Sequence, residues 1–312
     1  MTQEQKNALT ETGRMDGRDT FSEYHPLVNF AFFTIVFGFS MLSMHPVCLL
    51  ISFGAAACYL IRLRGEKAAD FLLKGVLPLW LVTVIVNPAF SHTGETILCY
   101  LPRGNPLTLE SILYGLDAGL MLAAVLTWFA CFSDVVTSDK FMYLFGRITP
   151  ALALLLSMTL RFIPRFKKQF DTVREVQKTL GHDVSAGPPL QRLKSALMCF
   201  SVVVTWSLEN AVETADSMKS RGFGTKRRTA YTVYRFTDRD RTALVFLAFC
   251  AIFFISGGLA GGLDWRFYPS VRGALLEPLT AALEIAYGLF CFMPIIIDRR
   301  EDALWKRFRS NI

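Results

Sequence analysis

Residues 112–133 read ILYGLDAGLMLAAVLTWFACFS, and this stretch decides the fold class because Asp117 is the one charged residue in an apolar run. A helix needs about 20 mostly apolar residues to cross the roughly 30 Å of hydrocarbon in a bilayer. The run therefore predicts a membrane-spanning helix. Gly115 and Gly119 flank Asp117 at a spacing that lets a second helix approach closely, which favours helix packing here and leaves a proton or ion relay as the second interpretation.

Five more apolar runs have a suitable length for spanning helices: 27–44, 46–62, 71–87, 243–260 and 279–297. The whole chain is 52% hydrophobic, which is too apolar for a water-soluble enzyme of 312 residues. Met44-His45-Pro46 predicts a tight turn between the first two spans, since proline ends one helix and suits the first turn of the next. We therefore expect an all-α polytopic membrane protein with about six transmembrane helices.

The basic residues predict the orientation of these spans. With the N-terminus inside, 29 of the 33 Lys and Arg residues fall in cytoplasmic segments, Lys74 lies near an inner end, and Arg103, Arg266 and Arg272 lie outside. This distribution follows the positive-inside rule. The excess positive charge therefore indicates membrane topology rather than nucleic-acid binding, and both termini are expected on the cytoplasmic side.

The expected organisation has five parts. A cytoplasmic N-terminal tail (1–26) precedes transmembrane helices 1 to 4 (27–133), and a cytoplasmic coupling-helix region (134–242) precedes transmembrane helices 5 and 6 (243–297) and a cytoplasmic C-terminal tail (298–312). The region 134–242 carries 18 of the 33 basic residues and many apolar ones, which is typical of a domain rather than a linker. Within it, 141–158 is apolar enough to lie in or against the membrane, which leaves the number of spans open.

Two long amphipathic helices are predicted inside this region. The first, from Ile163 to Leu180, has apolar residues at steps of three and four and stops at Gly181. The second follows Pro188-Pro189, runs from Leu190 to Arg221 and stops at Gly222. Both helices would present their ends to a binding partner, and docking into the groove of a partner protein is a common mode of recognition for such helices.

Signatures of catalysis and of metal binding are missing from the sequence. There is no nucleotide-binding phosphate loop, no zinc-protease motif and no nucleophile elbow. The seven cysteines and four histidines are scattered and include no C-x-x-C pair. We therefore expect no catalytic residue, no metal site and no cofactor on this chain, so that any ATP and Mg²⁺ would be bound by other subunits.

Several motifs resemble those of one transporter family. They are HPLVN at 25–29, NPAFSHTG at 87–94, LRFIPRF at 160–166 and ETADSMKSRGFG at 213–224. In this combination the chain is similar to the transmembrane (T) components of energy-coupling-factor (ECF) type ABC transporters, the cobalt-transporter-Q-like family. The resemblance covers most of the chain.

This resemblance implies a coupling subunit of the bacterial cell membrane without catalysis of its own. In the family, long cytoplasmic helices dock on two ABC ATPase subunits and transmit their closure to a membrane substrate-binding (S) component for uptake of a vitamin or a metal ion. Short Ala-Arg-Gly-like motifs at the helix ends place an arginine on each ATPase. Here the second corresponds to Ser220-Arg221-Gly222, and the first to Thr179-Leu180-Gly181.

Leu180 departs from the family pattern, which has arginine at this place. Leucine can fill an apolar pocket but cannot form the bidentate pair with a carboxylate that Arg221 can form. We therefore hypothesise that the two ATPases are unlike or form a fused pair. In the same resemblance, Arg161 and Pro164 mark the start of the first coupling helix, although an interfacial arginine and an ordinary helix start at proline would explain them nearly as well.

Two other functions remain possible at this point. A stand-alone secondary transporter would need convergent polar groups near the middle of the bilayer or inverted repeats, and the predicted spans show neither. The permease subunit of a conventional ABC importer would carry a shorter cytoplasmic coupling loop than 134–242. The size of that region favours the T component.

Overall fold

The computed structural model describes residues 19–100, 106–146, 149–181, 188–223, 234–273 and 277–310. The chain divides into two compact units. The first comprises Met1–Lys140 together with Tyr234–Ile312, and the second comprises Phe141–Val233. The ends of the second unit lie inside the bounds 134–242 that the sequence suggests for a separate region.

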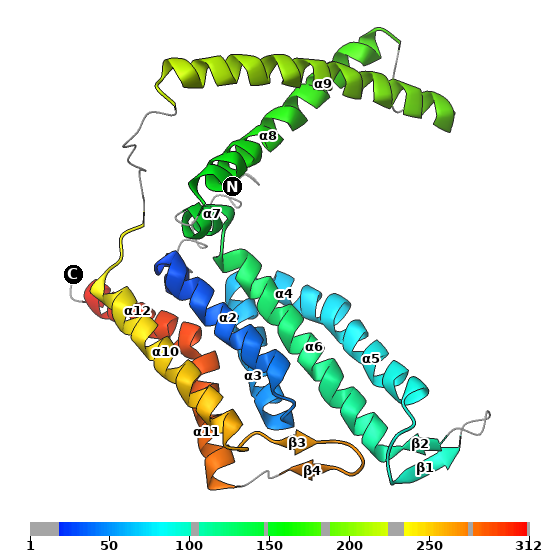
Figure 1. Cartoon of the computed structure of the whole chain (residues 1–312), viewed down its shortest axis with the longest axis vertical. Helices are drawn as coiled ribbons and strands as arrows, with labels where there is room; N and C mark the ends of the chain where they lie inside the picture. Colours follow the sequence, from blue (N-terminus) through cyan, green and yellow to red (C-terminus); the bar gives the residue numbers. More distant parts are fainter. Residues whose placement is uncertain are drawn as a thin grey trace. The chain divides into compact units, whose positions relative to one another are not determined.

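The first unit is a helical bundle (Figure 1). A short 3-10 helix, η2 (Thr20–Glu23), leads into its helices. In chain order these are α2 (Pro26–Leu42), α3 (Pro46–Arg64), α4 (Glu66–Phe71), the π-helical η3 (Leu72–Val76), α5 (Leu77–Phe90), α6 (Leu109–Val135), α10 (Asp238–Leu259), α11 (Pro278–Cys291) and α12 (Met293–Ser310). α7 (Ser138–Gly146) begins in this unit and continues into the second.

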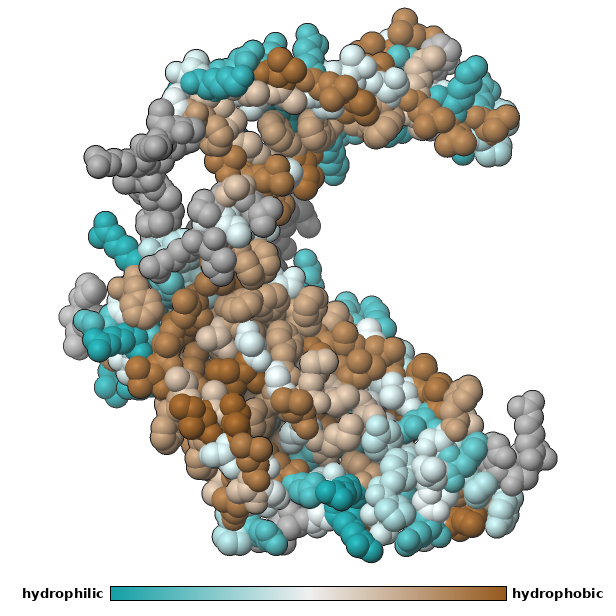
Figure 2. Space-filling model, in the orientation of Figure 1, coloured by the Kyte–Doolittle hydropathy of each residue, from teal (hydrophilic) through white to brown (hydrophobic). Residues whose placement is uncertain are grey.

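Length and composition confirm an all-α polytopic membrane protein. Among the described residues, five helical segments are long and apolar enough to cross a membrane, or six with one bent pair: α3, the continuous Glu66–Phe90, α6, α9, α10 and the pair α11–α12. α2 has 17 residues, which is the lower end of the usual range for a span. Figure 2 shows a broad hydrophobic band across the visible face of the bundle, with hydrophilic residues at the end that carries the strands.

The predicted spans differ from the structure in several places. α9, which was predicted to be a cytoplasmic helix, is long and apolar enough to cross a membrane, whereas the span predicted at 27–44 corresponds to the shorter apolar helix α2. The span expected at 279–297 is broken, because α11 ends at Cys291 and the helix resumes at Met293 with a bend of 52°. Pro294 has no N–H to continue the helical ladder at this point, which accounts for the break. The expected tail at 298–312 is helical as far as Ser310, within α12. By contrast, the predicted turn at His45-Pro46 is confirmed.

Aromatic side chains fill the centre of the bundle. Phe32 packs edge-on against Trp128, with ring centroids 5.8 Å apart, and lies 5.2 Å from the ring of Phe290. Trp128 is fully buried and donates its indole N–H to the Ser52 hydroxyl oxygen at 3.0 Å. Ser40 lies within 3.0 Å of Ser52, so the polar atoms in this core are paired with one another.

Glycines let α5 and α6 approach each other closely, as the spacing of Gly115 and Gly119 predicted. A Cβ added at Gly119 would lie 2.8 Å from a ring carbon of Trp80 and 3.2 Å from its backbone oxygen. The Trp80 indole N–H donates to the backbone oxygen of Leu116 at 3.3 Å, which ties the same two helices together. Asp117 is buried in this region of α6, with 5% of its surface exposed.

Two short strand hairpins lie at one end of the bundle (Figure 1) and were not anticipated from the sequence. One pairs β1 (Ile97–Tyr100) with β2 (Pro106–Thr108), and the other pairs β3 (Trp265–Arg266) with β4 (Arg272–Gly273). The backbone N–H of Glu95 donates to the backbone oxygen of Pro269 at 3.2 Å. The segments that carry the hairpins are therefore joined to each other.

The second unit contains two long helices, α8 (Pro150–Thr179) and α9 (Pro189–Ser220). Its buried core is small among the described residues and consists of Val173, Cys199 and Val203, with Phe170 packed against them. Phe166 adds an edge-on contact with Trp206, with ring centroids 6.0 Å apart. Within the described residues of this unit, most of the surface of both helices is therefore exposed.

Candidate functional site

The end of α8 has the form that the sequence predicted. Gly181 has φ of 86°, a conformation that favours glycine, and its N–H donates to the backbone oxygen of Lys178 at 3.1 Å. Thr179 donates its hydroxyl to the backbone oxygen of Val176 at 2.7 Å, which leaves its side chain folded onto the helix. Leu180 stands at the end with 67% of its surface exposed. The helix therefore presents an apolar tip.

The end of α9 is built in the same way but presents a charge. Gly222 has φ of 77°, and its N–H donates to the backbone oxygen of Lys219 at 2.9 Å, while the N–H of Phe223 donates to that of Met218 at 2.9 Å. This pair of bonds is the Schellman motif. Ser220 bonds back to the oxygen of Ser217 at 2.9 Å.

Arg221 is exposed at this end and forms no ion pair within the part of the chain that the structure describes. A guanidinium that is not paired with any described carboxylate can pair with one from a partner. Phe223, which the sequence did not single out, lies beside it with 43% of its surface exposed. The α9 tip thus combines a cation with an aromatic ring.

The last third of α9 is largely exposed. Glu209, Glu213 and Asp216 are exposed polar residues in this part of the helix. The apolar Val212 between them also has 64% of its surface exposed. Within the described residues of its own unit, this third of α9 is therefore mostly uncovered.

Arg161 and Pro164 do not start the first of these helices, so that prediction is wrong. α8 begins at Pro150 in its first turn, and Pro164 lies inside it. Proline at a helix start loses no hydrogen bond, and inside a long helix it removes only one, so α8 continues through Pro164. At 1.5 Å per residue, Arg161 lies about 28 Å along the axis from Leu180. The two exposed residues are therefore not part of the tip.

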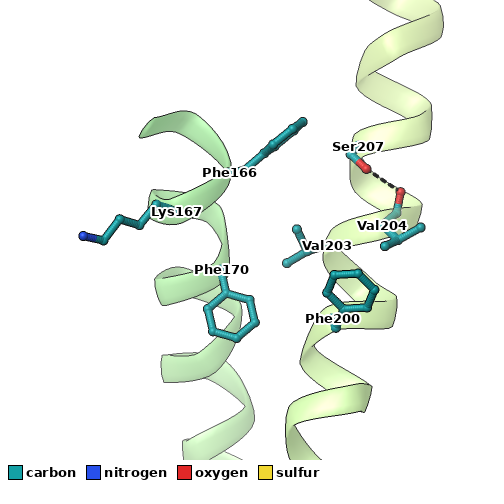
Figure 3. Close-up of a pocket in the computed structure, with 7 residues that line it drawn as sticks. All are labelled: Phe166, Lys167, Phe170, Phe200, Val203, Val204 and Ser207. Carbon is teal, nitrogen blue, oxygen red and sulfur yellow. Dashed lines mark hydrogen bonds between the residues drawn. The ribbon is translucent and has the colours of Figure 1, made fainter. Parts of the chain in front are cut away.

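An open apolar groove of about 400 Å³ lies between α8 and α9 (Figure 3). It is lined by Phe166, Lys167, Phe170, Phe200, Val203, Val204 and Ser207. Phe200 has 59% of its surface exposed, and the Lys167 side chain points away from the groove. The Ser207 hydroxyl in its lining donates to the backbone oxygen of Val204 at 2.8 Å, and the other lining side chains that face the groove are apolar.

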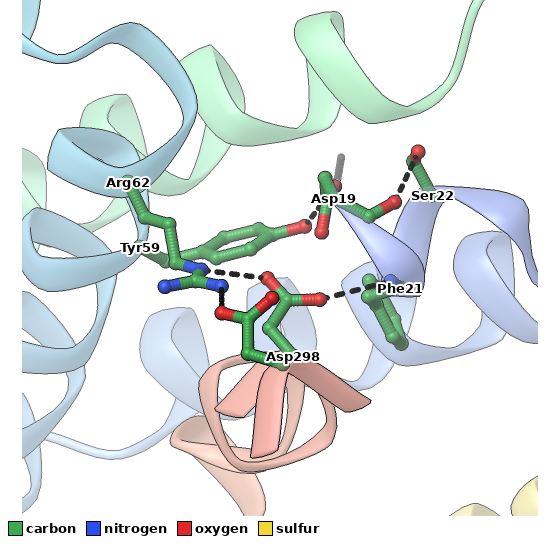
Figure 4. A network of polar contacts seen from close by, with 7 residues as sticks. Asp19, Phe21, Ser22, Tyr59, Arg62 and Asp298 are labelled. Carbon is green, nitrogen blue, oxygen red and sulfur yellow. Dashed lines mark hydrogen bonds and ion pairs between the residues drawn. The ribbon is translucent and has the colours of Figure 1, made fainter. Parts of the chain in front are cut away.

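A polar network joins the segment before α2 to the ends of α3 and α12 (Figure 4). Tyr59 donates to an Asp19 carboxylate oxygen at 2.8 Å, and Arg62 donates to Asp298 at 3.1 Å and also to Asp302. Burial, and then the neighbouring charge of Asp298, raise the pKa of Asp19 to about 7. Asp19 therefore titrates near neutral pH.

Two further titratable groups lie where the chain passes between the units. Burial lowers the pKa of Lys140, while the charge of Asp19 acts in the opposite direction. Burial, and then the nearby charge of Asp139, raise the pKa of Tyr234. No local sequence pattern marks these residues, because their partners are remote in the chain.

Among the described residues, no group of three or more His, Cys, Asp or Glu side chains could hold a metal ion. Taken together, the apolar helices and the pair of long helices with exposed, glycine-stopped ends define a polytopic α-helical membrane protein.

The family model of the cobalt transport protein CbiQ matches residues 22–231, which include both helix tips. The chain belongs to this family, the T components of energy-coupling-factor transporters.

Curated relatives agree over most of their length. The energy-coupling factor transporter transmembrane protein EcfT 1 of Listeria monocytogenes serotype 1/2a is 28% identical over 217 residues, which cover 64% of this chain and 77% of the relative. EcfT of Bacillus selenitireducens is 29% identical over 223 residues, or 66% of this chain and 79% of the relative. EcfT of Staphylococcus aureus is 26% identical over 197 residues, which cover 58% of this chain and 72% of the relative.

Proposed function

We propose that this chain is the membrane-embedded coupling subunit of an ECF-type importer. It transmits ATP-driven movement of two ABC ATPase subunits to a membrane S component that binds a vitamin or a metal ion. ATP hydrolysis, with its Mg²⁺, takes place on the ATPases, and this chain supplies no catalytic group. The distribution of Lys and Arg supports cytoplasmic termini and a cytoplasmic α8–α9 pair in the bacterial cell membrane.

One observation carries the proposal: α8 and α9 each end at a glycine-stopped, exposed tip in a unit that leaves most of its surface uncovered. Helices that are 30 and 32 residues long are stiff enough to carry a displacement from one end to the other. When the ATPases close on ATP, they move the tips seated on them. The displacement passes along α8 and α9 to the bundle and from there to the S component.

The two tips differ in chemistry, and the ATPases that receive them are proposed to differ as well. Arg221 pairs bidentately with a carboxylate on one ATPase. Leu180 enters an apolar pocket on the other. The complex therefore contains two unlike ATPases or a fused pair.

The proposal is tested by co-purification. The tagged chain is produced with the ATPases and the membrane proteins encoded beside it, and wild type is compared with Arg221→Glu. Reversing one partner of a buried charge pair costs about 2–5 kcal/mol, so the variant is expected to lose an ATPase. Lys168→Glu is the matched control, because Lys168 is an exposed cation on α8 away from both tips. A wild-type chain that retains no ATPase would contradict the proposal.

The second tip is tested separately with Leu180→Asp. An aspartate cannot enter an apolar pocket without losing its hydration. The variant is expected to lose one kind of ATPase and to retain the kind bound by Arg221. If a single kind of ATPase co-purifies with wild type, the hypothesis of unlike ATPases is wrong while the coupling role stands.

A further inference from the structure

The short segment Asp19–His25, just before the first long helix, is unusually well buried. Phe21 is completely buried, and Tyr24 and His25 have 7% and 8% of their surfaces exposed. A peptide of this length has too few contacts of its own to stay folded, so other parts of the bundle must hold it. Its contacts fall into three groups.

The first group lies where the chain leaves the bundle for the second unit. Lys140, the last residue of the bundle before that unit, has 7% of its surface exposed. Its ammonium donates to the backbone oxygen of Ser22 and, at 2.8 Å, to that of Val135. A buried ammonium needs such acceptors, and the end of α6 supplies one with favourable dipole charge. Lys140 therefore ties the start of α7 both to the segment and to the end of α6.

The second group lies where the chain re-enters the bundle. Asp240 closes a capping box with Thr237 at the start of α10 and also accepts a hydrogen bond at 2.9 Å from the backbone N–H of His25. Arg239 lies over the ring of Tyr24, 4.4 Å from its centroid, and pairs with Glu301 at 3.0 Å. The start of α10 is therefore fixed to the same segment as Lys140.

The third group anchors the segment to α3 and α12. The backbone N–H of Phe21 donates to Asp298 at 3.2 Å, and Tyr59 donates to Asp19 at 2.8 Å (Figure 4). The Phe21 ring packs edge-on against Phe32, with centroids 5.2 Å apart. Contacts made by seven consecutive residues thus join the departure point, the re-entry point and the bundle core.

We propose that Asp19–His25 is a clamp that holds together the two points at which the chain leaves and re-enters the bundle, with Lys140 and Arg239 as its positioning residues. The proposal rests on the coupling function proposed above. A displacement of the second unit can enter the bundle through these two connections. If they moved independently, local rearrangement would absorb the displacement, whereas joined connections pass it to α3, α6 and α12 as one movement.

The clamp is tested first in the full chain in lipid nanodiscs. Spin labels are placed at Ser138→Cys and Asp238→Cys, which are exposed residues beside the two connections, after Cys58 and Cys99 are replaced by serine. The five remaining cysteines are buried. With the clamp intact, the label-to-label distance is expected to show one narrow distribution. Lys140→Met and Arg239→Gln are each expected to broaden this distribution.

Three control variants distinguish a positioning role of Lys140 and Arg239 from a general loss of folding. Arg239 is 47% exposed, so Arg239→Gln tests the clamp even if Lys140→Met fails to fold. Arg239→Lys retains a cation over Tyr24 and is expected to restore the narrow distribution, which a loss of folding would not allow. Lys74→Met removes an exposed cation that pairs with Asp70 and is expected to change nothing. A narrow distribution in both clamp variants overturns the proposal.

The second test asks whether movement passes through the clamp. Cys99 is exposed on β1, which precedes α6, while Lys140 follows the other end of that helix, about 40 Å away. In the complex with both ATPases, trapping with ATP and vanadate is expected to change the rate of maleimide labelling at Cys99 about threefold or more. Arg239→Gln is expected to lose this response while still binding the ATPases and hydrolysing ATP.

The outcomes distinguish the clamp from the function on which it rests. A full labelling response in Arg239→Gln, or no response in a wild-type chain that binds the ATPases, overturns the clamp alone. A wild-type chain that binds no ATPase contradicts the proposed function and, with it, any part of the clamp in coupling.

Discussion

The bundle and the α8–α9 pair differ in the size of their buried apolar cores. In the bundle, Trp128 and Phe32 are completely buried and pack on one another. In the pair, the buried core is small, and Phe200 and Leu208 have 59% and 66% of their surfaces exposed. A chain rarely leaves large apolar patches uncovered without a partner or a membrane to cover them. The bundle therefore has a large buried core of its own, whereas most of the described surface of the pair is open to a partner or a membrane.

The largest expected effect is the loss of an aromatic side chain from the bundle core. Trp128→Ala should destabilise the protein by about 3–5 kcal/mol, because it leaves a cavity and removes the donor to Ser52. Phe200→Ala on α9 is the matched change in the pair and should stay within about 0.5 kcal/mol, since most of that ring is already exposed. Thermal unfolding of the purified chain in detergent measures both. An equal loss of stability in both variants would contradict the difference between the bundle and the pair.

The close approach of α5 and α6 should be the next most sensitive feature. Gly119→Ala should cost about 1–3 kcal/mol, because its new Cβ would meet both the ring and the backbone of Trp80. Gly54→Ala on α3 is the control, since no atom lies within 4 Å of a Cβ added there. The midpoint of unfolding should fall for the first variant and stay level or rise for the second.

The end of α8 at Gly181 should depend on the backbone conformation of this residue and not on the space around it. Gly181→Ala should cost about 1–2 kcal/mol, because φ of 86° is strained for alanine although the surrounding space is open. The loss should be confined to the last turn of α8. Faster hydrogen exchange at the backbone N–H groups of Leu180 and Gly181, with unchanged exchange in the bundle, would show this. Faster exchange in the bundle as well would contradict it.

The smallest effect concerns pH and the attachment of the segment before α2. The pKa of Asp19 is raised from 3.8 to about 7, so the folded state holds the proton more tightly than the unfolded state. Stability should therefore fall as the pH rises through the window from about 4 to about 7, because ionisation opposes folding there. Asp19→Asn should raise Tm by about 2 °C at pH 8 and by less at pH 5. An increase of equal size at both pH values would exclude this cause.

The features that the sequence predicted correctly depend on local chemistry. Pro46 starts α3, and Gly181 and Gly222 end α8 and α9, because proline and glycine act through their own backbone conformations. The apolar runs identified α3, α6 and α10 as candidate spans because their length and composition suffice, but they did not identify α9, which meets the same criteria. The rule that proline begins a helix gave the wrong start for α8, because Pro164 removes one hydrogen bond without ending the helix.

The features that the sequence did not predict depend on partners far apart in the chain. Lys140 and Ser22 are 118 positions apart, and nothing around either residue indicates that they meet. The break between α11 and α12 does have a local signal in Pro294, which the apolar run concealed. The exposure of Leu180 and Arg221 could be expected from their places at the ends of helices, but the sequence pattern does not identify a partner for them.

In the proposed complex the helix tips, and not the bundle, receive the ATPases. A photo-crosslinking amino acid is placed at Ser220 beside the α9 tip and, in a second variant, at Arg266 in the β3–β4 hairpin, which has 73% of its side chain exposed. Each variant is irradiated in membranes that contain the whole complex. ATPase adducts from position 220 and none from position 266 are the expected result. ATPase adducts from position 266, or their absence from position 220 in an assembled complex, would contradict the claim.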